Sequence, residues 1–263
     1  MGIVNVTPDS FSDGGHYFRS DAALSHARQL ILEGADILDI GGESTRPGAL
    51  PVSAQEELDR VIPLIEGLRG VSVPLSVDTC KAEVMCEALA AGANMINDID
   101  ALQQPEALAA VVASDAAVCL MHKQGKPQTM QELPQYQDVV AEVLQFLHAR
   151  IAAVENAGIE RERIVVDPGF GFGKTLEHNL ALLRSLNTFN ELPVPLLAGL
   201  SRKSMLGMIT GNDVKHRDYA SVTAALLAVQ RGAKIVRVHD VKATVDALKV
   251  LYAVNSTNIV CHG

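Results

Sequence analysis

The sequence predicts an α/β protein folded as a single (β/α)8 barrel. Eight short apolar runs alternate along the chain with longer amphipathic stretches, the pattern of strands and helices in a parallel α/β fold. Gly-Ala dipeptides at residues 34, 92 and 232 each precede one of the runs, which indicates that one kind of helix-to-strand turn is reused. The length of 263 residues also suits such a barrel, which typically has roughly 250.

The predicted strands are rich in Val, Ile and Leu and lack clean apolar–polar alternation, as expected of strands covered on both faces. They are Gly2–Val6, Ile37–Ile40, Val73–Val77, Met95–Ile96, Ala117–Met121, Ile164–Val166, Pro195–Ala198 and Ile235–Val238. Hydrophobic residues make up 48% of the chain but aromatic residues only 4%, so the core must be aliphatic.

The predicted helices lie between these runs and carry apolar residues along one face. They are Ala22–Glu33, Ala54–Leu68, Lys81–Ala91, Pro105–Ala113, Val139–Ala157, His178–Leu186, Tyr219–Arg231 and Val241–Val254. Right-handed crossovers allow an open doubly wound sheet or a closed barrel, and the eight repeated units favour the barrel. We expect one domain over residues 1–263 whose first strand begins at or near residue 2, either directly or after residues missing before Met1.

Composition excludes several functional classes. The net charge of −9 argues against a general nucleic-acid or anionic-membrane surface. The chain has no apolar run of about 18 residues, and its first residues do not form a signal peptide. Its four cysteines are scattered without a CxxC pair, which predicts free, buried or inert thiols. We therefore expect a cytoplasmic protein.

Polar residues follow almost every predicted strand, at the end where barrel enzymes carry their chemistry. These residues are Asn5, Asp78, Asn97, His122, Asp167, Lys203, Arg237 and His239. Asp and Asn can match the donors and acceptors of a flat heterocycle, whereas Arg, His and a Ser/Thr-rich turn suit an anion such as diphosphate. Asn5 offers an oxygen ligand for Mg²⁺, which binds phosphates while keeping most of its waters.

Three glycine-containing segments add to this pattern. Pro8–Arg19 and Gly42–Val52 are either ordinary flexible loops or a pair of lids that close over substrate, with Phe11 and Arg46 as contact residues. The sequence GFGFG at residues 169–173 does not have dinucleotide-binding spacing. We interpret it as a backbone-packing turn that brings Phe172 to the mouth of the barrel.

Eight sequence blocks resemble those of the dihydropteroate synthases, a family of pterin-binding barrel enzymes, over Gly2 to about Ala253. The blocks occur in family order and read GIVNVTPDSFSDGG, DIGGESTRPG, SVDT, IND, CLMH, DPGFGFGKT, GLSRKSMLG and RVHDV. One departure is Lys123 after the fifth strand, where the family is expected to have another residue. A second is the start at Met1, without the short segment that usually precedes the first strand.

The resemblance implies a transferase of folate biosynthesis. An enzyme of this family joins 6-hydroxymethyl-7,8-dihydropterin diphosphate to 4-aminobenzoate, uses Mg²⁺ and is the target of sulfonamides. It also implies a homodimer formed through helices near the C-terminal part of the barrel.

The resemblance also assigns roles to individual residues. Those matched to the pterin are Asp78, Asn97, Asp167, Lys203 and Arg237, of which all but Asn97 are also expected to be catalytic. Those matched to the diphosphate are Thr45, Arg237 and His239, with Asn5 on the metal. Those matched to 4-aminobenzoate are Phe11, Thr45, Pro47, Phe172, Lys203 and Ser204.

Other interpretations stay open at this stage. Lys203 is also compatible with a surface cation at a helix start, His239 and His122 with structural histidines, and Asp98 with a helix cap. A corrinoid-dependent methyltransferase would share the Asp and Asn contacts to a pterin, but would not need the SRKS block. A non-catalytic pterin- or phosphate-binding subunit would not need an intact polar ring.

Overall fold

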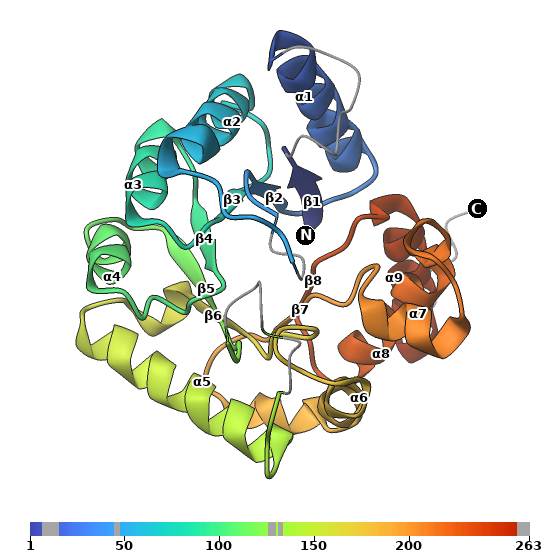
Figure 1. Cartoon of the computed structure of the whole chain (residues 1–263). Helices are drawn as coiled ribbons and strands as arrows, with labels where there is room; N and C mark the ends of the chain where they lie inside the picture. Colours follow the sequence, from blue (N-terminus) through green and yellow to red (C-terminus); the bar gives the residue numbers. More distant parts are fainter. Residues whose placement is uncertain (7–15, 45–47, 126–129, 131–133, 257–263) are drawn as a thin grey trace.

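The computed structural model describes residues 1–6, 16–44, 48–125, 130 and 134–256 (Figure 1). Its strands are β1 (Gly2–Asn5), β2 (Leu38–Gly41), β3 (Leu75–Asp78), β4 (Met95–Asp98), β5 (Ala117–Met121), β6 (Ile164–Asp167), β7 (Leu197–Ala198) and β8 (Ile235–Val236). Its α-helices are α1 (His16–Leu32), α2 (Ala54–Gly67), α3 (Ala82–Ala91), α4 (Pro105–Val112), α5 (Val139–Asn156), α6 (Leu176–Arg184), α7 (Ser204–Thr210), α8 (Asp218–Gln230) and α9 (Val241–Asn255). Short 3-10 helices are η2 (Arg161–Arg163), η3 (Leu186–Glu191) and η4 (Val214–His216).

The strands form a closed barrel surrounded by helices, which confirms the predicted fold class (Figure 1). Strands β1 to β6 pair in parallel in chain order, and β7 pairs with β8. The bridge between Val166 and Leu196 joins these two groups, and the bridge between Gly2 and Val238 closes the ring. At the closure, the Ile3 amide donates to the Val238 carbonyl at 3.0 Å.

The side chains of the strand residues form three groups: apolar ones that point outward, apolar ones inside the barrel near the strand starts, and polar ones inside the barrel near the strand ends. Outward residues such as Leu38, Ile40 and Val77 pack under the helices in the main hydrophobic core. A separate apolar cluster comprises Met1, Met95, Cys119, Val165 and Leu197. It fills the interior near the strand starts. The polar side chains occupy the interior toward the strand ends, so a site at that rim rests on an apolar floor.

The helices start and end within a few residues of prediction, with two differences. Helix α1 begins at His16, so the last part of the predicted loop Pro8–Arg19 is helical. Helix α7 was not predicted, because seven residues ending at Thr210 are too short for a clear helical period. Gly92, in one of the predicted helix-to-strand turns, caps α3 in a left-handed conformation with φ of 118°.

No helix in the described part of the chain is long and apolar enough to cross a membrane. Cys80, Cys86 and Cys119 are free thiols, and Cys261 lies outside the described residues. Cys86 is exposed on α3, so the expectation that the cysteines are buried is wrong for this residue.

Candidate active site

The interior polar layer is organised around Asp39, whose side chain is fully buried on β2. Its carboxylate accepts hydrogen bonds from the Ser76 hydroxyl at 2.6 Å, the Asn97 amide at 3.2 Å and Arg237 Nε at 2.5 Å. The donors come from β3, β4 and the end of β8. Because a buried carboxylate needs such partners, Asp39 fixes the positions of Asn97 and Arg237.

Arg237 connects this centre to Asp78. Its Nη2 donates to Asp78 Oδ2 at 2.7 Å, while its Nε remains on Asp39. Burial alone would lower the pKa of Arg237, but the two carboxylates raise it above its ordinary value, so the guanidinium stays charged. Burial raises the pKa of Asp78 to about 7, although Arg237 opposes that rise. Asp78 can therefore change its protonation state near neutral pH.

Asp167, Lys203 and Phe172 form the opposite side of the same interior. The Gly169 amide donates to Asp167 Oδ1 at 2.7 Å, and Lys203 Nζ lies 4.2 Å from the centre of the Phe172 ring. Burial raises the pKa of Asp167, with the Gly169 amide and Lys203 opposing. Burial lowers the pKa of Lys203 to about 8, with Asp167 opposing. A cation over an aromatic face beside a carboxylate suits a flat aromatic acid.

Two side-chain contacts join the ends of β7 and β8. Ser201 Oγ and His239 Nδ1 lie 2.9 Å apart, and the His239 amide donates to Ser201 Oγ at 3.2 Å. The Arg202 guanidinium donates to both oxygens of Asp240, at 2.7 and 3.3 Å. These contacts hold the SRK and RVHD segments together, and so place Lys203 and His239 on the same rim.

Asn5 lies at the end of β1, near a gap left by Gly41. A Cβ atom at Gly41 would be 3.6 Å from Asn5 Oδ1 and 3.9 Å from Asp78 Oδ2, so the glycine leaves room between them. Among the described residues, no group of three or more His, Cys, Asp or Glu side chains could hold a metal by itself. One amide oxygen beside an open space fits an ion that takes most of its ligands from phosphate and water.

His122, at the end of β5, faces a buried lysine. Its Nδ1 lies 3.0 Å from Lys174 Nζ, and its ring packs edge-on against Phe146 with 4.9 Å between centroids. Burial, with the charge of Lys174, lowers the pKa of His122 to about 3, so the ring is neutral. His122 therefore has a structural setting, in line with the second of its two interpretations.

Asp98 and Lys123 also have structural partners. Asp98 accepts from the amides of Asp100 and Leu102 at 2.8 and 2.7 Å, so it caps a turn rather than helix α4 as proposed. Lys123 forms an ion pair with Asp100 and ties the end of β5 to that turn.

The structure brings together the described residues predicted for the site, apart from Ser204. Asp78, Asn97, Asp167, Lys203 and Arg237 share the barrel interior. Asn5 and His239 lie on its rim, and Phe172 lies in the loop after β6. The Ser204 residue is exposed at the start of α7. The predictions for Phe11, Thr45, Pro47 and Arg46 lie outside the described residues.

Sequence reasoning missed Asp39, Ser76 and Lys174, all buried in the structure. Asp39 carries a signal that could have been used, because a charged residue inside an apolar strand must find a partner in the interior. Ser76 had no such signal. Lys174 directly follows the GFGFG segment in a predicted loop, where a lysine side chain is normally exposed.

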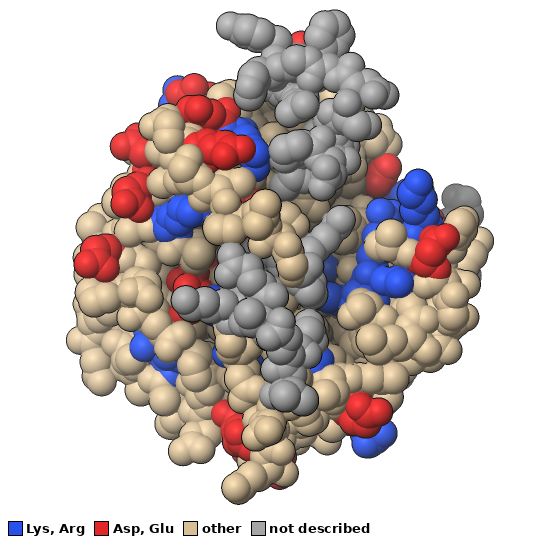
Figure 2. Space-filling view, viewed as in Figure 1, with Lys and Arg blue, Asp and Glu red and all other residues tan. Residues whose placement is uncertain are grey.

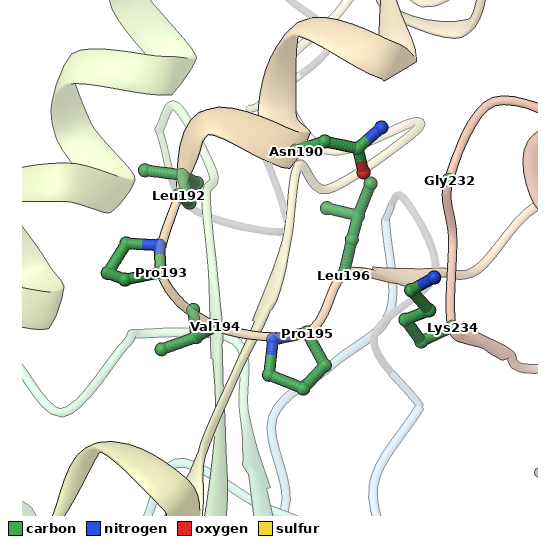
Figure 3. Close-up of a pocket in the computed structure, with 8 residues that line it drawn as sticks. All are labelled: Asn190, Leu192, Pro193, Val194, Pro195, Leu196, Gly232 and Lys234. Carbon is green, nitrogen blue, oxygen red and sulfur yellow. The ribbon is translucent and has the colours of Figure 1, made fainter.

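A cavity of about 480 Å³ lies away from these residues, lined in part by Pro195, Leu196 and Lys234 (Figure 3). Its lining precedes β7 and β8, so it opens at the strand-start end of the barrel. Lys234 is its single ionisable lining residue. Asn190 is the one amide among these lining residues, and none of them carries a carboxylate, so the cavity lacks the acids that pair with amides and cations at the other end.

Charge is unevenly distributed on the face drawn in Figure 2. Lys and Arg side chains gather beside α7 and α9, on the right of the view, whereas Asp and Glu predominate over α2 at the upper left. The cationic side adjoins the segments that carry Lys203 and His239. An anion approaching this acidic protein is thus attracted toward the β7–β8 side of the mouth.

The closed barrel and its polar interior define a class of protein, a barrel enzyme with a site at the strand ends. The family model described as "Pterin binding enzyme" matches residues 1–239. The dihydropteroate synthase of Haemophilus influenzae is 53% identical over 254 residues, covering 96% of this chain and 92% of its own.

Solved structures give the same result. The Xanthomonas albilineans dihydropteroate synthase with 4-aminobenzoic acid is 56% identical with a TM-score of 0.93, and the match covers 98% of this chain and 93% of that one. The Yersinia pestis enzyme with a sulfonamide drug is 50% identical with a TM-score of 0.93, covering 98% and 94%. The chain belongs to the dihydropteroate synthases of the pterin-binding enzyme family.

Proposed function

We propose that this chain condenses 6-hydroxymethyl-7,8-dihydropterin diphosphate with 4-aminobenzoate to give 7,8-dihydropteroate and pyrophosphate. The observation that carries the proposal is the shared interior of Asp78, Asn97, Asp167, Lys203 and Arg237. These residues come from five different strand ends, yet they surround one polar space above an apolar floor. The relatives named as dihydropteroate synthases support the same reaction.

The pterin occupies the barrel interior in this proposal. The carboxylates of Asp78 and Asp167 accept hydrogen bonds from its amino and ring N–H groups, and Asn97 offers both a donor and an acceptor. The planar guanidinium of Arg237, held by Asp39 and Asp78, packs against the flat ring. Lys203 donates to a ring acceptor from the other side.

The diphosphate lies toward the mouth of the barrel. Arg237 and His239 bind its oxygens, with Thr45, which lies outside the described residues. Asn5 would hold Mg²⁺ beside the diphosphate. The ion, when bound, neutralises charge on the leaving group. The space beside Gly41, between Asn5 and Asp78, supports this placement.

Bond breaking precedes bond making. The C–O bond between the pterin methylene and the diphosphate breaks, its electron pair leaves with pyrophosphate, and the pterin stabilises the methylene cation. Asp78 and Asp167 favour this cation electrostatically. The neutral amine of 4-aminobenzoate then attacks the methylene carbon, and its surplus proton passes to solvent or pyrophosphate. No enzyme nucleophile or dedicated base is needed.

The 4-aminobenzoate binds at the rim where Phe172 and Lys203 meet. The 4.2 Å contact between Lys203 Nζ and the Phe172 ring supports a pocket that is aromatic on one side and cationic on the other. The family resemblance adds Ser204 to this pocket, together with Phe11, Thr45 and Pro47, which lie outside the described residues. Sulfonamides resemble 4-aminobenzoate and compete for the same place.

A single-turnover experiment tests the order of events. The chain is mixed with pterin diphosphate and Mg²⁺, and pyrophosphate is measured with and without 4-aminobenzoate. We expect a burst of pyrophosphate in both samples. Strict dependence of the burst on the amine would contradict the dissociative order.

The activity itself is tested with purified protein, pterin diphosphate, labelled 4-aminobenzoate and Mg²⁺. We expect labelled dihydropteroate from the wild-type chain, and a loss of at least about a hundredfold in kcat/KM for Lys203→Ala, as for removal of a charged group in a catalytic site. Pterin binding without any turnover would instead favour a non-catalytic subunit.

The chain is also proposed to be a cytoplasmic homodimer. Several large apolar side chains on the helices of the C-terminal part are exposed. They are Met208 and Ile209 on α7, Val214 and Tyr219 at η4 and α8, and Val250, Tyr252 and Val254 on α9. Exposed apolar residues concentrated on neighbouring helices suit a subunit interface.

A further inference from the structure

The loop between β6 and α6 has little of its own to define its shape. Gly169, Gly171 and Gly173 all adopt left-handed conformations, with φ of 70°, 79° and 62°. Such glycines give the loop its path but supply no side chains to hold it. The loop nevertheless carries Phe172 and lies against two charged residues of the site, so its position must be fixed by other groups.

The ammonium group of Lys174 lies beneath this loop and is almost wholly buried. It donates to the Gly169 carbonyl at 2.8 Å and the Phe172 carbonyl at 3.0 Å, and lies 3.0 Å from His122 Nδ1. The His122 carbonyl, at 3.4 Å, is a fourth and more distant acceptor, so the three donors of an ammonium all find partners here. The side chain of Lys174 therefore binds backbone carbonyls of its own loop, and it links that loop to His122 at the end of β5.

Asn179 fastens the same loop from the other side. This buried side chain on α6 accepts from the Gly171 amide at 2.7 Å, and donates to the carbonyls of Lys174 at 3.2 Å and Thr175 at 2.6 Å. Lys174 thus holds the backbone at residues 169 and 172, and Asn179 holds it at residue 171.

The fastened atoms adjoin the site directly. The Gly169 amide contacts Asp167, and a Cβ atom at Gly171 would be 3.3 Å from Lys203 Cδ. The ring of Phe172 lies against Lys203. Asp167 belongs to β6 and is held by the barrel. The ring of Phe172 packs in a buried cluster with Ile99 and Met121, but its backbone belongs to the loop.

We propose that Lys174 and Asn179 are positioning residues that set the Phe172 ring against Lys203 and so determine the affinity for 4-aminobenzoate. This inference rests on the proposed function. Neither residue is placed on a substrate by the proposed function, although the charge of Lys174 also acts on the buried carboxylate of Asp167. Their effect is to hold the carbonyl and amide groups of residues 169–173 in one arrangement.

The test compares Michaelis constants for the two substrates. Lys174→Met keeps much of the apolar stem and removes the ammonium, and Asn179→Ala removes the outer contacts while leaving the ammonium in place. We expect each to raise KM for 4-aminobenzoate by about tenfold or more, since small displacements of a binding group have large effects. We expect KM for pterin diphosphate to change by less than about threefold.

The matched control is Ser114→Ala. It removes two side-chain hydrogen bonds, with the Val111 carbonyl and the Ala116 amide, in the turn that precedes β5 at the strand-start end of the barrel. We expect a lower Tm but an unchanged KM for 4-aminobenzoate. A folded Lys174→Met or Asn179→Ala variant with the wild-type KM for 4-aminobenzoate, or with equal changes for both substrates, would overturn the inference. If Lys174→Met fails to fold, Asn179→Ala decides alone. Absence of turnover in the wild-type chain would instead overturn the proposed function.

Discussion

At the residue scale, the site is a set of charges that are only partly neutralised by their neighbours. One guanidinium, Arg237, serves the two carboxylates of Asp39 and Asp78. Lys203 faces Asp167 across the interior, and burial shifts the pKa of each side chain in the direction that favours its neutral form. A charged substrate that enters this space completes the pairing, which helps to make binding selective for charged and polar heterocycles.

These shifts predict a narrow pH profile for kcat/KM. Asp78 acts as a carboxylate and its pKa is raised to about 7, so activity falls as pH decreases through 7. Lys203 acts as an ammonium and its pKa is lowered to about 8, so activity falls as pH increases through 8. The initial rate at low substrate, measured between pH 5.5 and 10, should therefore be bell-shaped.

Two variants assign the limbs of this profile. Asp78→Asn should abolish the acid limb in the residual activity, and Lys203→Arg should move the alkaline limb upward, because an arginine keeps its proton in this range. An acid limb that persists unchanged in Asp78→Asn would assign it to the substrate diphosphate and contradict this role for Asp78.

The sequence could predict Asp78, Asn97, Asp167 and His239 because each follows a predicted apolar run. Asp39 and Arg237 both lie inside a predicted run, and only Arg237 was given a role, which came from the family resemblance. The contacts around Lys174 could not be predicted, since three of its four acceptors are backbone carbonyls, those of His122, Gly169 and Phe172.

At the element scale, the β6–α6 loop is the segment whose shape depends most on glycine. A Cβ atom at Gly169 would be 1.8 Å from the His122 carbonyl oxygen, with φ of 70°. Gly169→Ala should therefore lower the free energy of unfolding by about 2–4 kcal/mol, the range for strain combined with steric overlap. Urea denaturation measures this change.

Gly158→Ala is the control for the backbone strain alone. Gly158 also has a positive φ, of 105°, but nothing lies within 4 Å of its Cβ position. The Gly158→Ala substitution should lower the free energy of unfolding by about 1–2 kcal/mol. Equal losses for the two substitutions would show that the close approach of β5 to this loop does not constrain residue 169.

The elements themselves were largely predictable because repeated βα units give eight similar signals. Strands β7 and β8 are the shortest in the structure, yet the apolar runs Pro195–Ala198 and Ile235–Val238 identified both. Helix α7 and the 3-10 helices were missed, since segments of three to seven residues show less than two turns of periodicity. The first residues of α1 were assigned to a loop because two glycines, Gly14 and Gly15, directly precede them in the sequence.

At the scale of the whole molecule, the exposed apolar residues of α7, α8 and α9 predict self-association. The chain of 28.0 kDa should sediment as a dimer of about 56 kDa, twice the mass of one chain. Combining Met208→Asp with Tyr219→Asp should shift it to a monomer. Leu32→Asp is the control, because Leu32 is equally exposed but lies at the end of α1. A wild-type monomer at micromolar concentration would contradict the prediction.

The two ends of the barrel differ, and that difference is the central claim of the account. The strand ends hold paired acids, amides and cations, whereas the cavity at the strand starts has one lysine among largely apolar residues (Figure 3). A crystal structure of this chain with a bound pterin tests the claim most directly. It should place the pterin ring within hydrogen-bonding distance of Asp78, Asn97 and Asp167, with Arg237 over its face. A pterin bound at the strand-start end, or outside the barrel interior, would contradict it.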